Sequence, residues 1–237
     1  IYFIFKVIIT YLNVIVKHND LILKLKKYMK IFITITLNIK KQMEFFMKIG
    51  IVCAGDEELE PFLPIIENCK ITEKAMLKFY EGIINGIEVV ALFSGVCKVN
   101  AAIATQILID NFKVNIIINS GVAGGIDSNL NIFDTVISTE VAYHDVEKGI
   151  LTEFHPWMES VYFKADSKLV NLSKKAVEKM TLENKVVWGR MVTGEAFISD
   201  EGREQIKNQF NPLTVDMETG SIAHVCYVNN IPFIAIR

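Results

Sequence analysis

Carboxylates follow an apolar segment near the end of this sequence of 237 residues, in the stretch VDMETG. There Asp216 and Glu218 flank Met217 where a strand-like segment gives way to a helix-like one. Carboxylate oxygens can accept hydrogen bonds from the paired hydroxyls of a ribose, and methionine adds an adaptable apolar surface. The alternative interpretation is that the acids only complement the dipole at a helix start.

A second group of acids lies in CAGDEELE, residues 53–60, directly after an apolar run. A carboxylate held at such a strand-to-helix turn could take a proton from water as a general base. Charge complementation at the helix N-terminus is again the plainer alternative.

Two further turns could border a ligand. NSGVAGG, residues 119–125, is rich in glycine but matches neither nucleotide-binding fingerprint, so it indicates only a close approach of the backbone to a ligand or another strand. In VTGEAFIS, residues 192–199, Phe197 could pack in the core or stack on a planar base. His144 and Asp145 could form an acid–base pair, although a structural role is commoner for such a pair.

Strand-like and helix-like segments alternate after Met47 and must position these side chains. The pattern predicts a mixed, mostly parallel sheet covered by helices on both faces, which is a three-layer α/β/α sandwich. Asn85-Gly86 predicts a β-hairpin. We expect strands at 48–54, 114–121, 133–145, 185–192, 212–217 and 232–237, and helices at 56–68, 98–112, 167–180, 200–210 and 218–230. Ligands bind beyond the carboxyl ends of strands in such sheets, which is where the turns above fall.

Composition narrows the class of protein. Half of the residues are apolar, which is ample for a core, and the net charge of −2 gives no reason to expect a nucleic-acid partner. The four cysteines have no metal-ligand spacing, so we expect reduced thiols, no metal and a cytoplasmic protein.

Residues 1–46 differ from the rest because they contain no Gly, Pro or Ala and carry eight lysines against two acids. The apolar run 1–16 is shorter than the ~20 residues of a membrane span, and no cleavage site of a secretory signal follows it. We expect a non-native or disordered extension read from upstream A/T-rich DNA, with Met47 as the native start and 47–237 as the functional domain.

Several motifs in register resemble the 5′-methylthioadenosine/S-adenosylhomocysteine nucleosidases of the nucleoside phosphorylase superfamily. The resemblance covers residues 47–237 and rests on the following stretches: MKIGIVCAGDEELEPF, SGVCKVNAA, IINSGVAGG, AYHD, GEAFIS, VDMETGSIAHVC and IPFIAIR. It implies a homodimeric enzyme without a cofactor that hydrolyses the bond between adenine and the thioribose sugar.

The resemblance also implies residue roles. Glu58 activates the attacking water, and Arg237 lies near that water. Glu218 binds the ribose hydroxyls together with Met217, and Asp216 supports them.

On the base side, the resemblance implies that Phe197 stacks on adenine, that Ile198 offers backbone contacts and that Gly124 borders the ligand. In the family a Ser-Asp pair and a C-terminal helix follow the strand IPFIAIR, whereas this sequence ends at Arg237. We therefore expect impaired activity in this chain. The alternatives are a purine nucleoside phosphorylase, a futalosine-type hydrolase and an inactive nucleoside-binding fragment.

Overall fold

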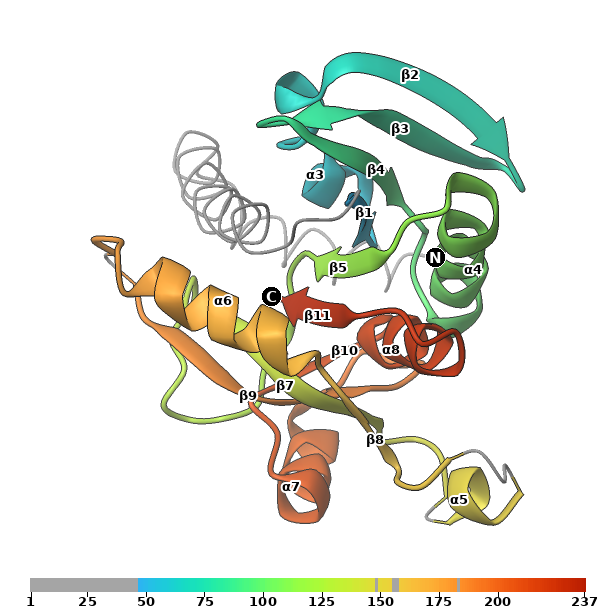
Figure 1. Cartoon of the computed structure of the whole chain (residues 1–237). Helices are drawn as coiled ribbons and strands as arrows, with labels where there is room; N and C mark the ends of the chain where they lie inside the picture. The colour runs from blue at the N-terminus through green and yellow to red at the C-terminus, as the bar shows by residue number, and fades with distance from the viewer. Residues whose placement is uncertain (1–46, 148, 155–157, 183) are drawn as a thin grey trace, which may run out of the picture.

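The computed structural model describes residues 47–147, 149–154, 158–182 and 184–237, and the expectations for 1–46 lie outside them. Eleven strands of the described residues form one sheet, in the order β2-β3-β4-β1-β5-β11-β7-β9-β10-β6, with β8 paired to β7 (Figure 1). Parallel and antiparallel pairings both occur, so the mixed sheet is confirmed.

The centre of the sheet consists of short apolar strands in parallel. β1 (Lys48–Cys53) lies between β4 (Ile87–Phe93) and β5 (Ile116–Ser120), and β11 (Phe233–Ile236) follows on the other side of β5. Nearly every residue of these strands is buried, as expected when both faces of a parallel sheet are covered.

The other half of the sheet begins at β7 (Thr135–Tyr143), which is antiparallel to β11. β9 (Val186–Thr193) and β10 (Thr214–Asp216) continue parallel to β7. The short strands β6 (Gly124–Gly125) and β8 (Tyr162–Lys164) pair antiparallel with β10 and β7.

Helices cover both faces of this sheet, which confirms the three-layer architecture (Figure 1). α4 (Lys98–Phe112) and α8 (Thr219–Val228) pack on one apolar face, and α3 (Asp56–Leu59) and α6 (Ser167–Val177) on the other. None of the helices in the described part of the chain is long and apolar enough to span a bilayer.

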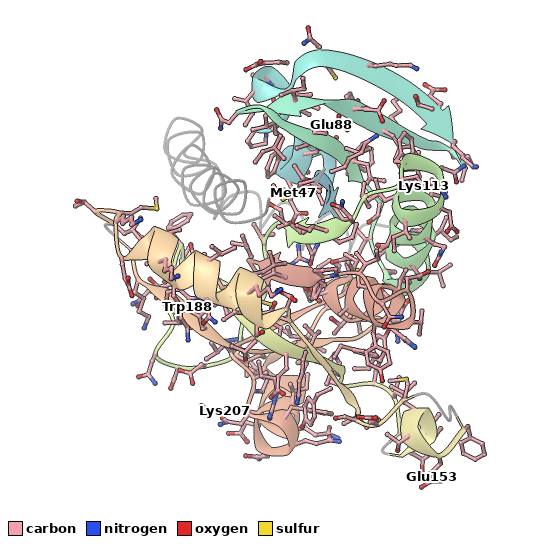
Figure 2. All side chains as sticks on the ribbon, viewed as in Figure 1. Met47, Glu88, Lys113, Glu153, Trp188 and Lys207 are labelled. Atoms are coloured by element: carbon pink, nitrogen blue, oxygen red, sulfur yellow. The ribbon has the colours of Figure 1, made fainter. Side chains whose placement is uncertain are left out.

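The described residues contain two more helices. α7 (Asp200–Phe210) contributes Ile206 and Phe210 to a separate apolar cluster, and α5 (Ile150–Phe154) is short. Trp188 of β9 donates its indole N–H to the Ser173 hydroxyl of α6 at 2.8 Å, which fixes this helix to the sheet; Figure 2 shows Trp188 beside α6.

The expectation of one helix over 56–68 is wrong. α3 ends at Leu59, a single 3₁₀ turn covers Leu63–Ile65, and the edge strand β2 (Glu67–Lys74) begins two residues later. Pro61 and Pro64 lack the N–H that a continuing α-helix needs, so the helix stops after one turn. β2 was missed because it is exposed along almost its whole length and shows no apolar pattern.

The hairpin expected at Asn85-Gly86 is confirmed. It joins β3 (Leu77–Ile84) to β4, and both turn residues have positive φ, 52° and 74°. This left-handed geometry is that of a type I′ turn, which matches the twist of the flanking strands.

We expect Gly86→Val to lower the free energy of unfolding by about 1–2 kcal/mol, because a β-branched residue is strained at positive φ. Urea denaturation measures the change. Asn85→Gly is the control and should be tolerated, since glycine adopts this conformation freely. Equal stability of Gly86→Val and the parent would contradict the assigned turn.

Candidate active site

The guanidinium of Arg237, which directly follows β11, is the centre of a buried charge cluster. Its Nε and Nη2 donate to Oδ2 of Asp216 at 2.9 and 2.8 Å. Nη2 also donates to Oε2 of Glu218 at 3.3 Å, and Nη1 lies 3.8 Å from Oε1 of Glu58. One cation thus holds together three acids that are up to 160 positions apart in the sequence.

The four side chains of this cluster are almost completely shielded from solvent, with Arg237 at 0% and Glu58 the most exposed at 13%. Burial alone would lower the pKa of Arg237, but Asp216, Glu58 and Glu218 together raise it above its usual value. Burial raises the pKa of Glu218, against the opposing effect of Arg237. The surplus of negative charge suits a ligand that is neutral or develops positive charge.

Glu58 bridges the ends of two central strands. Its Oε2 accepts from the N–H of Ala54 at 2.6 Å and of Gly55 at 3.4 Å, both just after β1. Its Oε1 accepts from the N–H of Val122, just after β5, at 2.7 Å. Each carboxylate oxygen can accept more than one hydrogen bond, so this fixed carboxylate can still bind a water molecule.

Gly121 leaves room for the side chains of Glu58 and Arg237 beside the main chain. A Cβ at this position would lie 2.3 Å from Oε1 of Glu58 and 2.4 Å from Nη1 of Arg237. The close approach expected of the 119–125 turn is therefore to two charged side chains of the cluster.

Glu218 is fixed from a second direction. Its Oε1 accepts from the N–H of Cys97 at 2.9 Å, at the start of α4. Cys97 has φ 85° and ψ 161°, a backbone conformation that is almost restricted to glycine. In this strained conformation the N–H of Cys97 points towards the Glu218 carboxylate.

A layer of buried polar groups supports Asp216, and no sequence motif had identified these groups as site residues. Oδ1 of Asp216 accepts from the hydroxyl of Thr193 at 2.6 Å and from the N–H of Thr219 at 3.2 Å. Thr219 is also hydrogen-bonded to Oδ1 of Asn119 at 2.6 Å. The signal available in the sequence was the pair Asn119-Ser120 at the end of an otherwise apolar strand.

The remaining candidates surround the cluster without joining it. Met217 is half-buried between the two acids, and Gly124 pairs with Val215 in the short β6–β10 ladder. Phe197 lies between β9 and α7 with 82% of its surface exposed, whereas Ile198 packs against the apolar cluster under α7.

His144 and Asp145 do not act as a pair here. Asp145 accepts from Lys98 and from the N–H of Glu195, while Nε2 of His144 is buried against Gly194 without a hydrogen-bond partner in the described part of the chain. Burial lowers the pKa of His144, which favours the neutral ring of a structural histidine.

The four turns selected from the sequence therefore meet at one place, and the start of the SGVCKVNAA motif, residues 94–98, joins them. Contacts of Glu58, Arg237, Glu218 and Glu195 connect segments 54–60, 94–98, 120–125, 193–198 and 216–218. Within residues 47–237 as described, no group of three or more His, Cys, Asp or Glu has the arrangement of a metal site.

We expect Cys97→Gly to raise the free energy of unfolding by about 1 kcal/mol, because glycine adopts this conformation without strain but costs more entropy on folding. Chemical denaturation measures it. Cys97→Ser keeps the Cβ and should show no gain. A less stable glycine variant would mean that Cys97 is not strained.

Comparison with known proteins places the chain in a family. The model of the phosphorylase superfamily matches residues 48–237. The 5′-methylthioadenosine/S-adenosylhomocysteine nucleosidase of Halalkalibacterium halodurans is 43% identical over 195 residues, which are 80% of this chain and 83% of that protein.

Solved structures agree. The nucleosidase of the same name from Colwellia psychrerythraea, in complex with adenine, is 36% identical with a TM-score of 0.74 and covers 81% of each chain. That from Neisseria meningitidis, in complex with methylthio-immucillin-A, is 33% identical with a TM-score of 0.74 over 80% of this chain and 84% of that one. Futalosine hydrolase of Helicobacter pylori is 27% identical with a TM-score of 0.72 over 81% and 83%. This chain therefore belongs to the phosphorylase superfamily and, within it, to the 5′-methylthioadenosine/S-adenosylhomocysteine nucleosidases.

Proposed function

We propose that this protein hydrolyses the N-glycosidic bond of 5′-methylthioadenosine and S-adenosylhomocysteine, releasing adenine and the thioribose sugar. The observation that carries the proposal is the contact of Arg237 with Glu58, Asp216 and Glu218, which gathers a base for water and acceptors for a ribose at one place. The names of the relatives and the adenine and inhibitor in the neighbouring structures support the choice of substrate.

In this proposal Glu218 accepts hydrogen bonds from the ribose 2′ and 3′ hydroxyls, with Met217 against the sugar. Cys97 and Arg237 hold the Glu218 carboxylate from two sides, so little ordering remains to be done when the substrate binds. Asp216 is the main partner of Arg237 and has a supporting role.

Glu58 is the proposed general base. As water attacks C1′, its proton passes to the Glu58 carboxylate, the bond between C1′ and the adenine nitrogen breaks, and the bonding electrons leave with the base, which takes up a proton. The transition state resembles an oxocarbenium ion, and nearby carboxylates stabilise its positive charge. Such proton transfer contributes roughly 10²–10⁴ in rate.

On the base side, the exposed ring of Phe197 is free to stack on adenine, which aromatic faces favour. Ile198 offers backbone groups beside it, and Gly124 borders the ligand. The hydrogen bond of Glu195 to the N–H of Lys98, next to Cys97, supports a place for Phe197 on the Glu218 side of the cluster.

The charge of the cluster favours water over phosphate as the nucleophile. Phosphorolysis requires cations that bind an anion, as arginine does through its paired donors. Here Arg237 already contacts three carboxylates, so a phosphate beside Glu58 would meet net negative charge.

We also infer the remaining properties that the family resemblance implies. Residues 47–237 form the nucleosidase domain, in agreement with the family match at 48–237. We propose a cytoplasmic homodimer without cofactor. Exposed Val96, Val99 and Ile103 give α4 and the turn before it an apolar surface that a second subunit could cover.

Wild-type protein should release adenine from 5′-methylthioadenosine at a rate that does not depend on inorganic phosphate. Glu58→Gln should lower kcat by roughly 10²–10⁴, because glutamine cannot accept the proton, while a nucleoside analogue still binds. Adenine release and calorimetric binding measure the two effects, and the neighbouring exposed Glu57→Gln is the control.

Four other outcomes would contradict the proposed hydrolysis or the role of Glu58. Phosphate-dependent release would indicate a phosphorylase, and cleavage of futalosine in preference to methylthioadenosine would indicate the related hydrolase. Analogue binding without any turnover by the wild type would indicate a nucleoside-binding fragment. Full turnover by Glu58→Gln would remove Glu58 from its proposed role.

Gly121→Ala should lower kcat/KM by at least about tenfold, because the new methyl group displaces Glu58 or Arg237 from positions that the reaction requires. Steady-state kinetics measures this, with Gly125→Ala as control because its Cβ would meet only ordinary contacts at 3.9 Å. Unchanged kinetics in Gly121→Ala would show that the placement of these charges is not critical.

A further inference from the structure

Lys98, Asp145 and Glu195 form a closed ring of contacts beside the charge cluster. The Lys98 ammonium donates to both oxygens of Asp145, at 2.9 and 3.0 Å. Oδ2 of Asp145 also accepts from the N–H of Glu195 at 2.9 Å, and Oε1 of Glu195 accepts from the N–H of Lys98 at 2.7 Å. Each of the three residues therefore contacts the other two.

This ring connects the two halves of the proposed substrate site. Lys98 follows Cys97, whose N–H holds the ribose-side carboxylate of Glu218. Glu195 lies two residues before Phe197, the aromatic residue proposed to stack on the base. Through Asp145, both segments are also joined to the end of β7.

The ring differs from an ordinary surface ion pair. The side chains of Lys98 and Asp145 are 22% and 27% exposed, and a solvated pair alone contributes at most about 1 kcal/mol. Two of the contacts, however, join a carboxylate to a backbone N–H and so fix the main chain. The Lys98 ammonium also lies 5.2 Å from the centre of the Tyr143 ring, which restricts where it can move.

Phe197 depends on such a fixed main chain. Its side chain is 82% exposed, so packing contributes little to its position. Glu195 is the residue through which the segment 195–198 is hydrogen-bonded to α4 and to Asp145.

We propose that Lys98, Asp145 and Glu195 are positioning residues that hold the Phe197 segment at a fixed place relative to Glu218, and thereby determine affinity for the base without contacting the reacting atoms. The inference that this position serves substrate binding rests on the proposed function. The contacts among Lys98, Asp145 and Glu195 do not depend on the proposed function.

Hydrogen exchange tests the ring independently of any activity. Asp145→Ala should speed amide exchange in residues 195–198 by about tenfold, because the N–H of Glu195 loses its charged acceptor. The control is Glu81→Gln, which breaks the Lys48–Glu81 pair of similar exposure (21% and 34%) and lies on β3. Equal exchange in both variants would overturn the proposal.

Kinetics tests the consequence for substrate. Glu195→Ala should raise the KM for methylthioadenosine and the Kd of adenine by about tenfold, while kcat stays within about threefold of the parent. Glu195→Gln keeps an acceptor for the N–H of Lys98. It should therefore restore the KM and the Kd of the parent. A fall in kcat alone, or no rescue by glutamine, would overturn the positioning role. Absence of methylthioadenosine cleavage by the parent would instead refute the proposed function. In that case hydrogen exchange and adenine binding would still show whether the three residues position the Phe197 segment.

Discussion

The burial of one arginine among three carboxylates is the constraint on which the rest of this structure depends. Removing a guanidinium from water is costly, and the cost is offset only when its partners are close and hydrogen-bonded. Arg237 meets this condition through Asp216, Glu218 and Glu58, which come from two other segments of the chain. The strand β11 must therefore lie in the middle of the sheet, so that its end reaches the turns after β1 and β10.

Backbone features that are unfavourable elsewhere serve this cluster. Gly121 leaves no side chain where Glu58 and Arg237 approach the main chain, and Cys97 adopts a conformation suited to glycine so that its N–H reaches Glu218. Local strain of this kind persists when surrounding contacts compensate for it, and it concentrates at functional sites. The orientation of the two glutamates is thus built into the folded chain before a ligand binds, which is the condition for effective electrostatic catalysis.

The candidate site divides into a buried part and a partly solvated part. Glu58, Asp216 and Glu218 are buried and hydrogen-bonded from several directions, so their positions follow from the core. Phe197 is exposed and depends on the partly solvated ring of Lys98, Asp145 and Glu195. The two parts are therefore held by different interactions: the acids by the buried core, and the Phe197 segment by hydrogen bonds near the surface.

The sequence by itself determined the order and type of most elements, because apolar periodicity and the Asn85-Gly86 turn are local signals. It also identified the turns that carry the site and a family resemblance that the comparisons confirmed. It missed β2, whose exposed charged side chains show no pattern, and it did not select Asn119 or Thr193. Only the tertiary structure decided that Glu218 meets Cys97 across 121 positions, that Gly121 rather than Gly124 touches the charges, and that Asp145 binds Lys98. These contacts depend on how strands order within the sheet, and spacing along the chain does not encode that order.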